Sequence, residues 1–146
     1  MTQSYDAFLS YSHDDRRIAE RISRRLRTYR PPHASGLSRR LRVFRDVELM
    51  TTAASLPDEL VEQISKANQL ILLASPSAKS EYINLEVETF LEQKGIGQLR
   101  IVLLRGELEE SLPAALQNLP VEPLFIDLRG ADRKRFRLET LRLLAA

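Results

Sequence analysis

The chain has 146 residues, of which 43% are hydrophobic and 29% are charged, and its formal net charge is +2. This length is typical of one domain, so we expect a single domain over residues 1–146. No apolar run approaches the roughly 20 residues that a membrane-spanning helix needs, and the first residues lack the basic and apolar segments of a secretory signal. The chain contains no cysteine, which excludes disulfides and thiolate metal sites. We therefore expect a cytoplasmic protein with no metal site and no membrane association.

Arginine is concentrated in the first third of the chain, between Arg16 and Arg45. A basic face of this kind attracts nucleic acid in some proteins. Few aromatic residues lie between these arginines to stack on bases, so we interpret them as the solvated side of one helix and its following loop. Nucleic-acid binding remains a minor alternative.

The first third of the chain predicts two strands separated by a helix. Residues 5–11 contain a compact apolar run, which is typical of a strand covered on both faces. A helix is expected to begin at Ser12, which opens a capping-box pattern, and to end at Pro31. A short second strand is predicted over residues 41–44, followed by a polar loop over residues 45–55.

The middle of the chain predicts a helix, a central strand and another helix. Pro57 opens a helix whose buried stripe reaches Ala67. Residues 69–74 have no polar side chain after Gln69 and predict a central strand, and Ser80 begins the next helix.

The last third repeats the alternation with shorter elements. Strands are expected over residues 101–104 and 124–127, with a short helical segment over residues 112–119 between them. A final helix carries apolar side chains that include Phe136 and Leu138.

Five strands joined by crossover helices predict an α/β fold, a flavodoxin-like five-stranded parallel sheet with helices on both faces. In such sheets ligands bind beyond the carboxyl ends of the strands. The candidate site therefore lies on the segments that start at Ser10, Arg45, Ser75 and Arg105.

Two phosphate-binding motifs known on this architecture are absent. The segment after the first strand, Ser10 to Asp14, has no glycine, which excludes a Rossmann-type dinucleotide turn. No Walker-type sequence is present either, and Ser75 stands at the end of the third strand where a phospho-accepting receiver domain has an aspartate.

The helix that starts at Ser80 contains an unusual carboxylate. At about 100° per residue, the helix has a buried stripe formed by Ile83, Val87, Phe90 and Leu91. Glu86 falls at the edge of that stripe, one turn after Tyr82. A carboxylate at such a boundary is partly desolvated, which suits catalysis, although most boundary glutamates are ordinary surface residues.

Four segments together resemble one family. Residues 5–12 (YDAFLSYS), 42–49 (RVFRDVEL), 71–76 (ILLASP) and 80–86 (SEYINLE) resemble, in the same order, motifs of Toll/interleukin-1 receptor (TIR) domains, with the bacterial branch the most similar. Each motif alone is weak, but their order across most of the chain identifies it as a member of this family.

The resemblance implies one of two functions. Many TIR domains cleave NAD⁺ at the nicotinamide–ribose bond, whereas others only bind each other. The catalytic glutamate of the family corresponds to Glu86, and the same comparison implies that Tyr82, Ser10, Arg45 and Asp46 surround the dinucleotide, which is a substrate and not a cofactor. A salt bridge to a neighbour remains an alternative for Arg45, and a structural hydrogen bond for Ser10.

Two departures from the family pattern bear on this expectation. The family's usual tryptophan is Tyr82 here, which keeps an aromatic wall but adds a hydroxyl that needs a partner. The segment 50–55 lacks the glycine often found in the corresponding loop of the family, the BB loop.

We therefore expect an NAD⁺ nucleosidase that releases nicotinamide and ADP-ribose or a cyclic variant. Family members are commonly activated by TIR–TIR self-association, so we also expect one module of a larger protein of bacterial immune signalling. The alternatives are a non-catalytic interaction module and, less favoured, an enzyme for another N-glycosidic substrate.

Overall fold

A computed structural model of the chain describes residues 5–28, 42–47, 57–78, 80–117 and 123–143. It contains one parallel sheet whose strands lie in the order β2-β1-β3-β4-β5. The strands are β1 (Tyr5–Tyr11), β2 (Val43–Val47), β3 (Ala67–Ala74), β4 (Leu99–Leu103) and β5 (Leu124–Asp127). This is the flavodoxin-like order that the sequence predicts, so the predicted fold class is confirmed.

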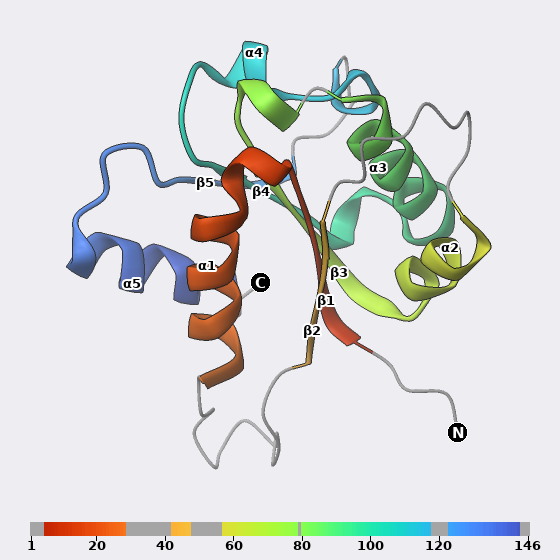
Figure 1. Ribbon diagram of the computed structural model, residues 1–146, viewed down its shortest axis with the longest axis horizontal. Helices are drawn as coiled ribbons and strands as arrows, with labels where there is room; N and C mark the ends of the chain where they lie inside the picture. Colours follow the sequence, from red (N-terminus) through yellow and green to blue (C-terminus); the bar gives the residue numbers. More distant parts are fainter. Residues whose placement is uncertain (1–4, 29–41, 48–56, 79, 118–122, 144–146) are drawn as a thin grey trace.

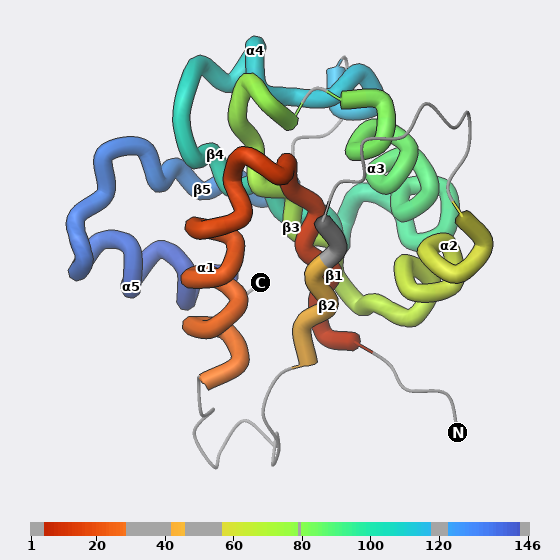
Figure 2. Tube along the Cα trace, viewed as in Figure 1, coloured from red at the N-terminus to blue at the C-terminus, as the bar shows by residue number. Residues whose placement is uncertain are grey.

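Helices cover both faces of this sheet (Figure 1). They are α1 (Arg16–Thr28), α2 (Asp58–Ser65), α3 (Glu81–Lys94), α4 (Leu108–Ser111) and α5 (Arg133–Arg142). Helices α1 and α5 lie on one face, and α2 and α3 lie on the other. The connections that follow β1, β3 and β4 come together at one end of the sheet, as Figure 2 shows, because all strands are parallel.

Alternation along the strands divides the core into two layers. Phe8 and Leu70 belong to the layer under α2 and α3, whereas Leu9 and Ile71 belong to the layer under α1 and α5. Successive side chains of a strand point to opposite faces, so neighbouring residues of β1 serve different layers. Ser10 consequently faces the α3 side of the sheet, which is the side of Glu86.

Strand β2 lies farther along the chain than predicted. It covers Val43–Val47, and Arg45, Asp46 and Val47 pair with Leu9, Ser10 and Tyr11 of β1. Residues 45–47, which the sequence assigned to a loop, therefore belong to the strand, and the rest of the expected loop lies outside the described residues. Pairing with β1 decides this boundary, since an edge strand accepts polar side chains that a sequence pattern reads as loop.

Two helical predictions are also corrected. Ala67 is the first residue of β3 and not part of the preceding helix, which ends at Ser65. A helical segment was expected over residues 112–119. Helix α4 instead lies before it and ends at Ser111, and the described part of the expected segment contains only a 3-10 turn at Ala114–Leu116. Leu112 is extended, with φ −100° and ψ 132°, because the residue before a proline is pushed out of the helical region.

The residues that α5 buries are not all among the apolar residues that the sequence predicts for its core face. Phe136, Thr140 and Leu143 are buried, whereas Leu138 is 56% exposed. Leu138 follows Phe136 by about 200° around the helix, which turns it away from the sheet.

No helix among the described residues is long and apolar enough to span a membrane.

Candidate active site

Glu86 is buried and receives a hydrogen bond from the first strand. Its side chain is on α3 and is 1% exposed, and the Ser10 hydroxyl of β1 donates to Glu86 Oε1 at 2.8 Å. Ser10 itself is fully buried. Seventy-six positions separate these two residues in the sequence, so only the packing of α3 on the sheet brings them together.

The local sequence of α3 explains how Glu86 is held. Ser80 caps the helix, and its hydroxyl accepts from the Ile83 amide at 3.2 Å. Ile83, Val87 and Phe90 then lie against the sheet and are fully buried, and Leu91 packs against the same layer but is only partly buried. This confirms the predicted stripe, but the stripe is wider than expected, because Glu86 is inside the buried face and not at its edge.

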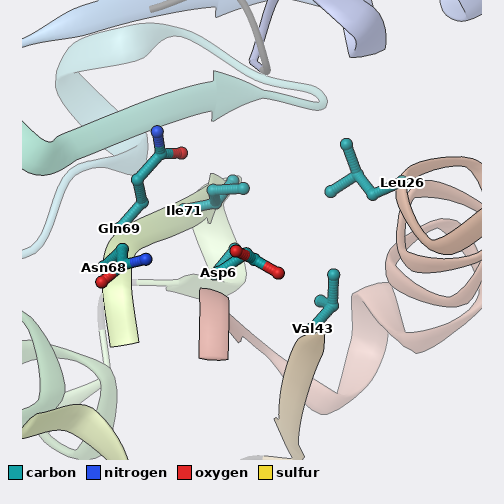
Figure 3. A pocket seen from close by; sticks show the side chains of 7 residues that line it. Asp6, Leu26, Val43, Asn68, Gln69 and Ile71 are labelled. Carbon is teal, nitrogen blue, oxygen red and sulfur yellow. The ribbon is translucent and has the colours of Figure 1, made fainter. Parts of the chain in front are cut away.

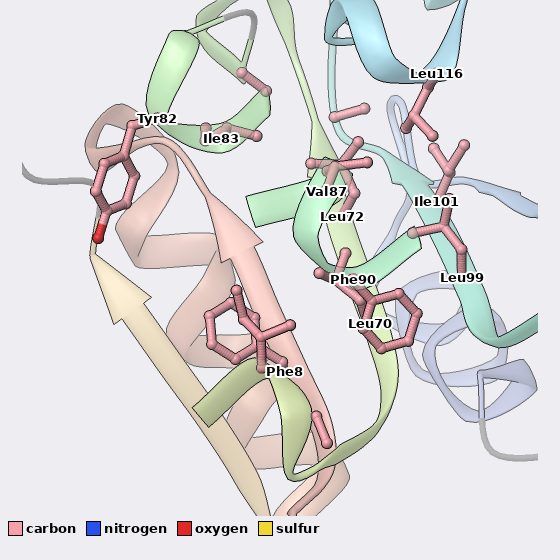
Figure 4. Close-up of a cluster of buried hydrophobic side chains, with 14 of the residues drawn as sticks. Phe8, Leu70, Leu72, Tyr82, Ile83, Val87, Phe90, Leu99, Ile101 and Leu116 are labelled. Carbon is pink, nitrogen blue, oxygen red and sulfur yellow. The ribbon is translucent and has the colours of Figure 1, made fainter. Parts of the chain in front are cut away.

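Tyr82 lies one helical turn before Glu86 on the same side of α3. It is 7% exposed and belongs to the apolar layer that contains Phe8. Figure 4 shows its ring directed from α3 toward the carboxyl ends of the first two strands, with the hydroxyl at the far end. Residues at i and i+4 are neighbours on a helix, so Tyr82 and Glu86 share one surface at the end of the sheet.

Arg45 and Asp46 are neighbours on β2, and successive residues of a strand alternate between the two faces of the sheet. Asp46 is in register with Ser10 across the β1–β2 ladder, and its side chain lies outside the described residues. Arg45 pairs with Leu9, is exposed, and lines a cavity together with residues of α1. The structure therefore brings Ser10, Tyr82 and Glu86 together and directs Arg45 toward the opposite face of the sheet. The segment 50–55 lies outside the described residues.

A polar network beside these residues was not predicted as a unit. Asp15 is 5% exposed, accepts a hydrogen bond from the Ser75 hydroxyl at 2.5 Å, and receives the Arg105 Nε at 3.2 Å. Arg105 also donates to Ser77 at 2.9 Å, and the Ser77 hydroxyl donates to Asp14 at 3.0 Å. The network joins the segments that follow β1, β3 and β4. The sequence predicts these segments as part of the candidate site, because they start at the carboxyl ends of the strands.

This network replaces the predicted capping box. The Ser12 hydroxyl accepts from the Asp14 amide at 3.3 Å, as a cap does. The Asp15 carboxylate, which a capping box would turn back toward Ser12, instead bonds Ser75 of the neighbouring strand. This hydrogen bond joins the segments that follow β1 and β3, the place where doubly wound folds commonly bind ligands.

A small cavity lies at the opposite end of the sheet (Figure 3). Its volume is about 130 Å³, and residues at the starts of three strands line it, including Asp6, Val43 and Asn68. Ligand sites of α/β sheets lie at the carboxyl ends of the strands, and small-molecule pockets measure about 300–1,000 Å³. This cavity is therefore a packing gap and not a second candidate site.

The buried carboxylate limits the chemistry that the site can perform. Among the described residues, no group of three or more histidine, aspartate or glutamate side chains is placed to hold a metal ion. A carboxylate held by a hydroxyl donor stabilises positive charge that develops on a bound molecule, and an adjacent aromatic wall keeps water out.

One known protein family matches most of the chain. The family model described as "TIR domain" matches residues 7–143. The chain belongs to the TIR domain family. The resemblance of the four sequence motifs is thereby confirmed, and the β1 and α3 motifs of this TIR domain are the segments that meet at Ser10 and Glu86.

A curated relative gives the comparison a chemical context. The TIR domain is 33% identical over 148 residues to "NAD(+) hydrolase ApTIR" of Actinoplanes sp. (strain ATCC 31044 / CBS 674.73 / SE50/110), and the match covers 87% of this chain. It covers 20% of that relative, so the chain spans about one fifth of the relative's length.

Solved structures agree with the fold. The TIR domain of the Toll-related receptor TRR-2 of Hydra magnipapillata has a TM-score of 0.58 at 15% identity, and the match covers 97% of each chain. The TIR domains of the activated Roq1 resistosome, which recognises the pathogen effector XopQ, have a TM-score of 0.52 at 19% identity, covering 71% of this chain and 60% of that one. A flavodoxin-like domain from Synechococcus sp. has a TM-score of 0.53 at 20% identity, covering 94% of each chain. At these identities the likeness concerns the fold.

Proposed function

We propose that this TIR domain is an NAD⁺ nucleosidase and that Glu86 is its catalytic residue. The observation that carries the proposal is the buried Glu86 carboxylate, which accepts a hydrogen bond from Ser10 at 2.8 Å and lies one turn after Tyr82. The 33% identity to a protein named as an NAD(+) hydrolase supports this choice of substrate.

One carboxylate is enough for the proposed reaction. The bond between C1′ of the ribose and the pyridinium nitrogen breaks, and its electron pair goes to nicotinamide, which leaves as a neutral molecule. Most glycosidases need a second carboxyl group to protonate a poor leaving group, but this leaving group needs no proton. Glu86 stabilises the positive charge that develops on the ribose, and water attacks C1′ and loses a proton.

The other residues of the site have supporting roles in this proposal. Ser10 fixes the direction of the Glu86 carboxylate, and Tyr82 forms the wall beside the nicotinamide ribose. Asp46 is at the same level of the sheet as Ser10 and borders the substrate there. Arg45 lines the cavity beside α1, so in this structure it is a less direct candidate for substrate contact.

Self-assembly is the proposed switch. Glu86 is 1% exposed, so substrate reaches it only after some rearrangement at the strand ends. The resistosome TIR domains with this fold function in an assembly, which supports a similar arrangement here. We further propose that the chain is one module of a larger cytoplasmic protein of bacterial immune signalling.

The test is nicotinamide release by the domain clustered on a surface or fused to an oligomer-forming partner. We expect release by the unmodified domain and a fall of at least about a hundredfold in kcat for Glu86→Gln, which keeps the shape of the side chain and removes its charge. Glu88→Gln is the matched control, because Glu88 is on the same helix and exposed. Equal release by the domain and Glu86→Gln would reject the catalytic role.

The second candidate is a non-catalytic module that works through TIR–TIR contacts. Tyr82 in place of the family's tryptophan and the missing glycine of the segment 50–55 favour it. In that case clustered protein releases no nicotinamide, and Glu86→Gln leaves self-association unchanged in sedimentation experiments.

A further inference from the structure

Four arginines line a groove between α1 and the edge strand β2. The α1–β2 groove has a volume of about 570 Å³, and its charged lining consists of Arg16, Arg17, Arg27, Arg45 and Glu20. These side chains give it a net charge of +3. It lies on the α1 face of the sheet, whereas Ser10 and Glu86 meet on the α3 face. The groove is therefore separate from the candidate active site.

The positive charge of the groove is poorly compensated. Among the ion pairs of the described residues, none includes Arg17, Arg27 or Arg45. Arg16 bonds the ring of His13 at 2.8 Å, and Glu20 pairs with Arg24 at 3.4 Å. Guanidinium groups that outnumber the carboxylates around them repel one another, and a bound anion relieves that repulsion.

The acidic residues that precede α1 do not reach the groove. Asp14 receives its hydrogen bond from Ser77, and Asp15 is bonded to Ser75 and Arg105. Both carboxylates are thus turned toward the segments after β3 and β4. The amino end of α1, which carries a partial positive charge, adds to the field of Arg16 and Arg17.

The arginines are placed for more than one negative group. Arg16 and Arg17 are in the first turn of α1, and Arg45 is the middle residue of β2, which pairs in parallel with β1. All three line the groove, from its two opposite walls. Arg27 is eleven residues after Arg16, about 16 Å farther along the helix axis.

We propose that the α1–β2 groove binds the oligophosphate group of a small molecule. Guanidinium groups match the geometry of phosphate oxygens and bind them through paired hydrogen bonds. The volume of the groove is within the usual range for small-molecule sites. Arg16, Arg17 and Arg45 take the phosphate groups from the two walls of the groove, and Arg27 binds a further anionic or polar group of an extended ligand.

Single-stranded nucleic acid fits this groove less well. Proteins that bind it stack bases on accessible aromatic rings. Tyr11, at the groove, is 2% exposed, and the Phe44 ring is stacked on Phe8 with centroids 5.2 Å apart. Tyr11 is buried and Phe44 is half-buried against Phe8, so the groove has the charge for phosphate but little aromatic surface for bases.

The test is calorimetric titration of the domain with inorganic triphosphate, a nucleoside triphosphate and sulfate at matched ionic strength. We expect both triphosphates to bind and sulfate to bind much more weakly. Arg17→Gln/Arg45→Gln weakens triphosphate binding by about tenfold for each arginine, the loss typical of a charge-assisted hydrogen bond. Tighter binding of the nucleotide than of inorganic triphosphate identifies a nucleotide as the source, and equal binding identifies free oligophosphate.

The matched control is Arg133→Gln/Arg137→Gln, which removes the same charge from exposed positions of α5. We expect this variant to bind triphosphate as the unmodified domain does. Equal weakening by both double variants would overturn the proposal, because it would mean that net charge alone attracts the anion. A different result would overturn the proposal in favour of nucleic acid: the domain binds a thymidine oligonucleotide but not triphosphate, and Arg17→Gln/Arg45→Gln weakens the binding of the oligonucleotide.

Discussion

Ser10 and Glu86 form a contact between a buried hydroxyl and a buried carboxylate. Burying a carboxylate costs free energy unless hydrogen bonds compensate for the lost water. Ser10 supplies one such bond at 2.8 Å, from a strand whose position is fixed by neighbours on both sides. The hydroxyl therefore holds one Glu86 oxygen in place, which suits a group that must meet a substrate in one orientation.

Ser10→Ala is expected to lower kcat by about 10- to 100-fold and to change KM much less. The reason is that a hydrogen bond to a charged group contributes about 1.5–3 kcal/mol, and here it orients the carboxylate and not the substrate. Steady-state kinetics of clustered protein measures both parameters. Ser12→Ala, in the same segment but bonded to the Asp14 amide, is the control. An unchanged kcat for Ser10→Ala would contradict the positioning role.

Asp127 gives a prediction for the pH dependence of stability. Its carboxylate accepts hydrogen bonds from the amide, Nε and Nη2 of Arg129, at 2.9, 3.0 and 2.8 Å. The side-chain bond to Arg129 is the main cause that lowers the pKa of Asp127. A lowered folded-state pKa contributes stability above the unfolded value, near 3.9, and this stability is lost as the pH falls through the folded-state pKa.

Asp127→Asn is therefore expected to lower the free energy of unfolding at pH 7 by a small amount, because the pair is partly exposed. The difference from the unmodified domain disappears below the folded-state pKa of Asp127. Urea denaturation at pH 7 and at about pH 3 measures it. A difference that is the same at both pH values would contradict the electrostatic explanation.

At the scale of elements, the network of Asp15, Ser75 and Arg105 joins three strand ends. Helix α1, the 3-10 turn at Pro76–Ala78 and the segment after β4 are held in one arrangement by these side chains. The network thereby holds the 3-10 turn that precedes α3, the helix that carries Glu86 and begins at Glu81.

Asp15→Ala is expected to lower the free energy of unfolding by about 1–3 kcal/mol, because the buried Ser75 hydroxyl loses its acceptor. Asp14→Ala is the matched control. The Asp14 carboxylate is exposed and accepts a hydrogen bond from the Ser77 hydroxyl, so its removal is expected to lower the free energy of unfolding by less than about 1 kcal/mol. Urea denaturation of the two variants gives the comparison. Equal losses would show that burial of the network is unimportant.

At the scale of the whole molecule, the nearly complete burial of Glu86 leads to a prediction about assembly. If contacts between copies uncover this residue, the rate of nicotinamide release per molecule rises with protein concentration or on fusion to an oligomer-forming segment. We expect the dilute monomer to be nearly inactive. The measurement is nicotinamide release per molecule across a dilution series, with the oligomeric state followed by light scattering. A constant rate across dilution would contradict activation by self-association.

The sequence alone predicts much of the fold because the pattern is local. The predicted limits of β1 and β5 agree with the structure, and Ser80 caps α3 as predicted. These features depend on apolar runs and capping side chains within a few residues. The boundary of β2 was wrong because pairing with β1, not local composition, decides where an edge strand ends.

The sequence also singles out Glu86 and Tyr82, since their spacing along one helix is fixed by helical geometry. It does not determine that Glu86 is fully buried or that Ser10 is its donor, nor that Arg45 lies on the other face of the sheet. Those facts depend on how α3 packs across β1 and on which side of each strand a residue points. Contacts between residues 76 positions apart exist only once the sheet has formed, and so the tertiary structure decides them.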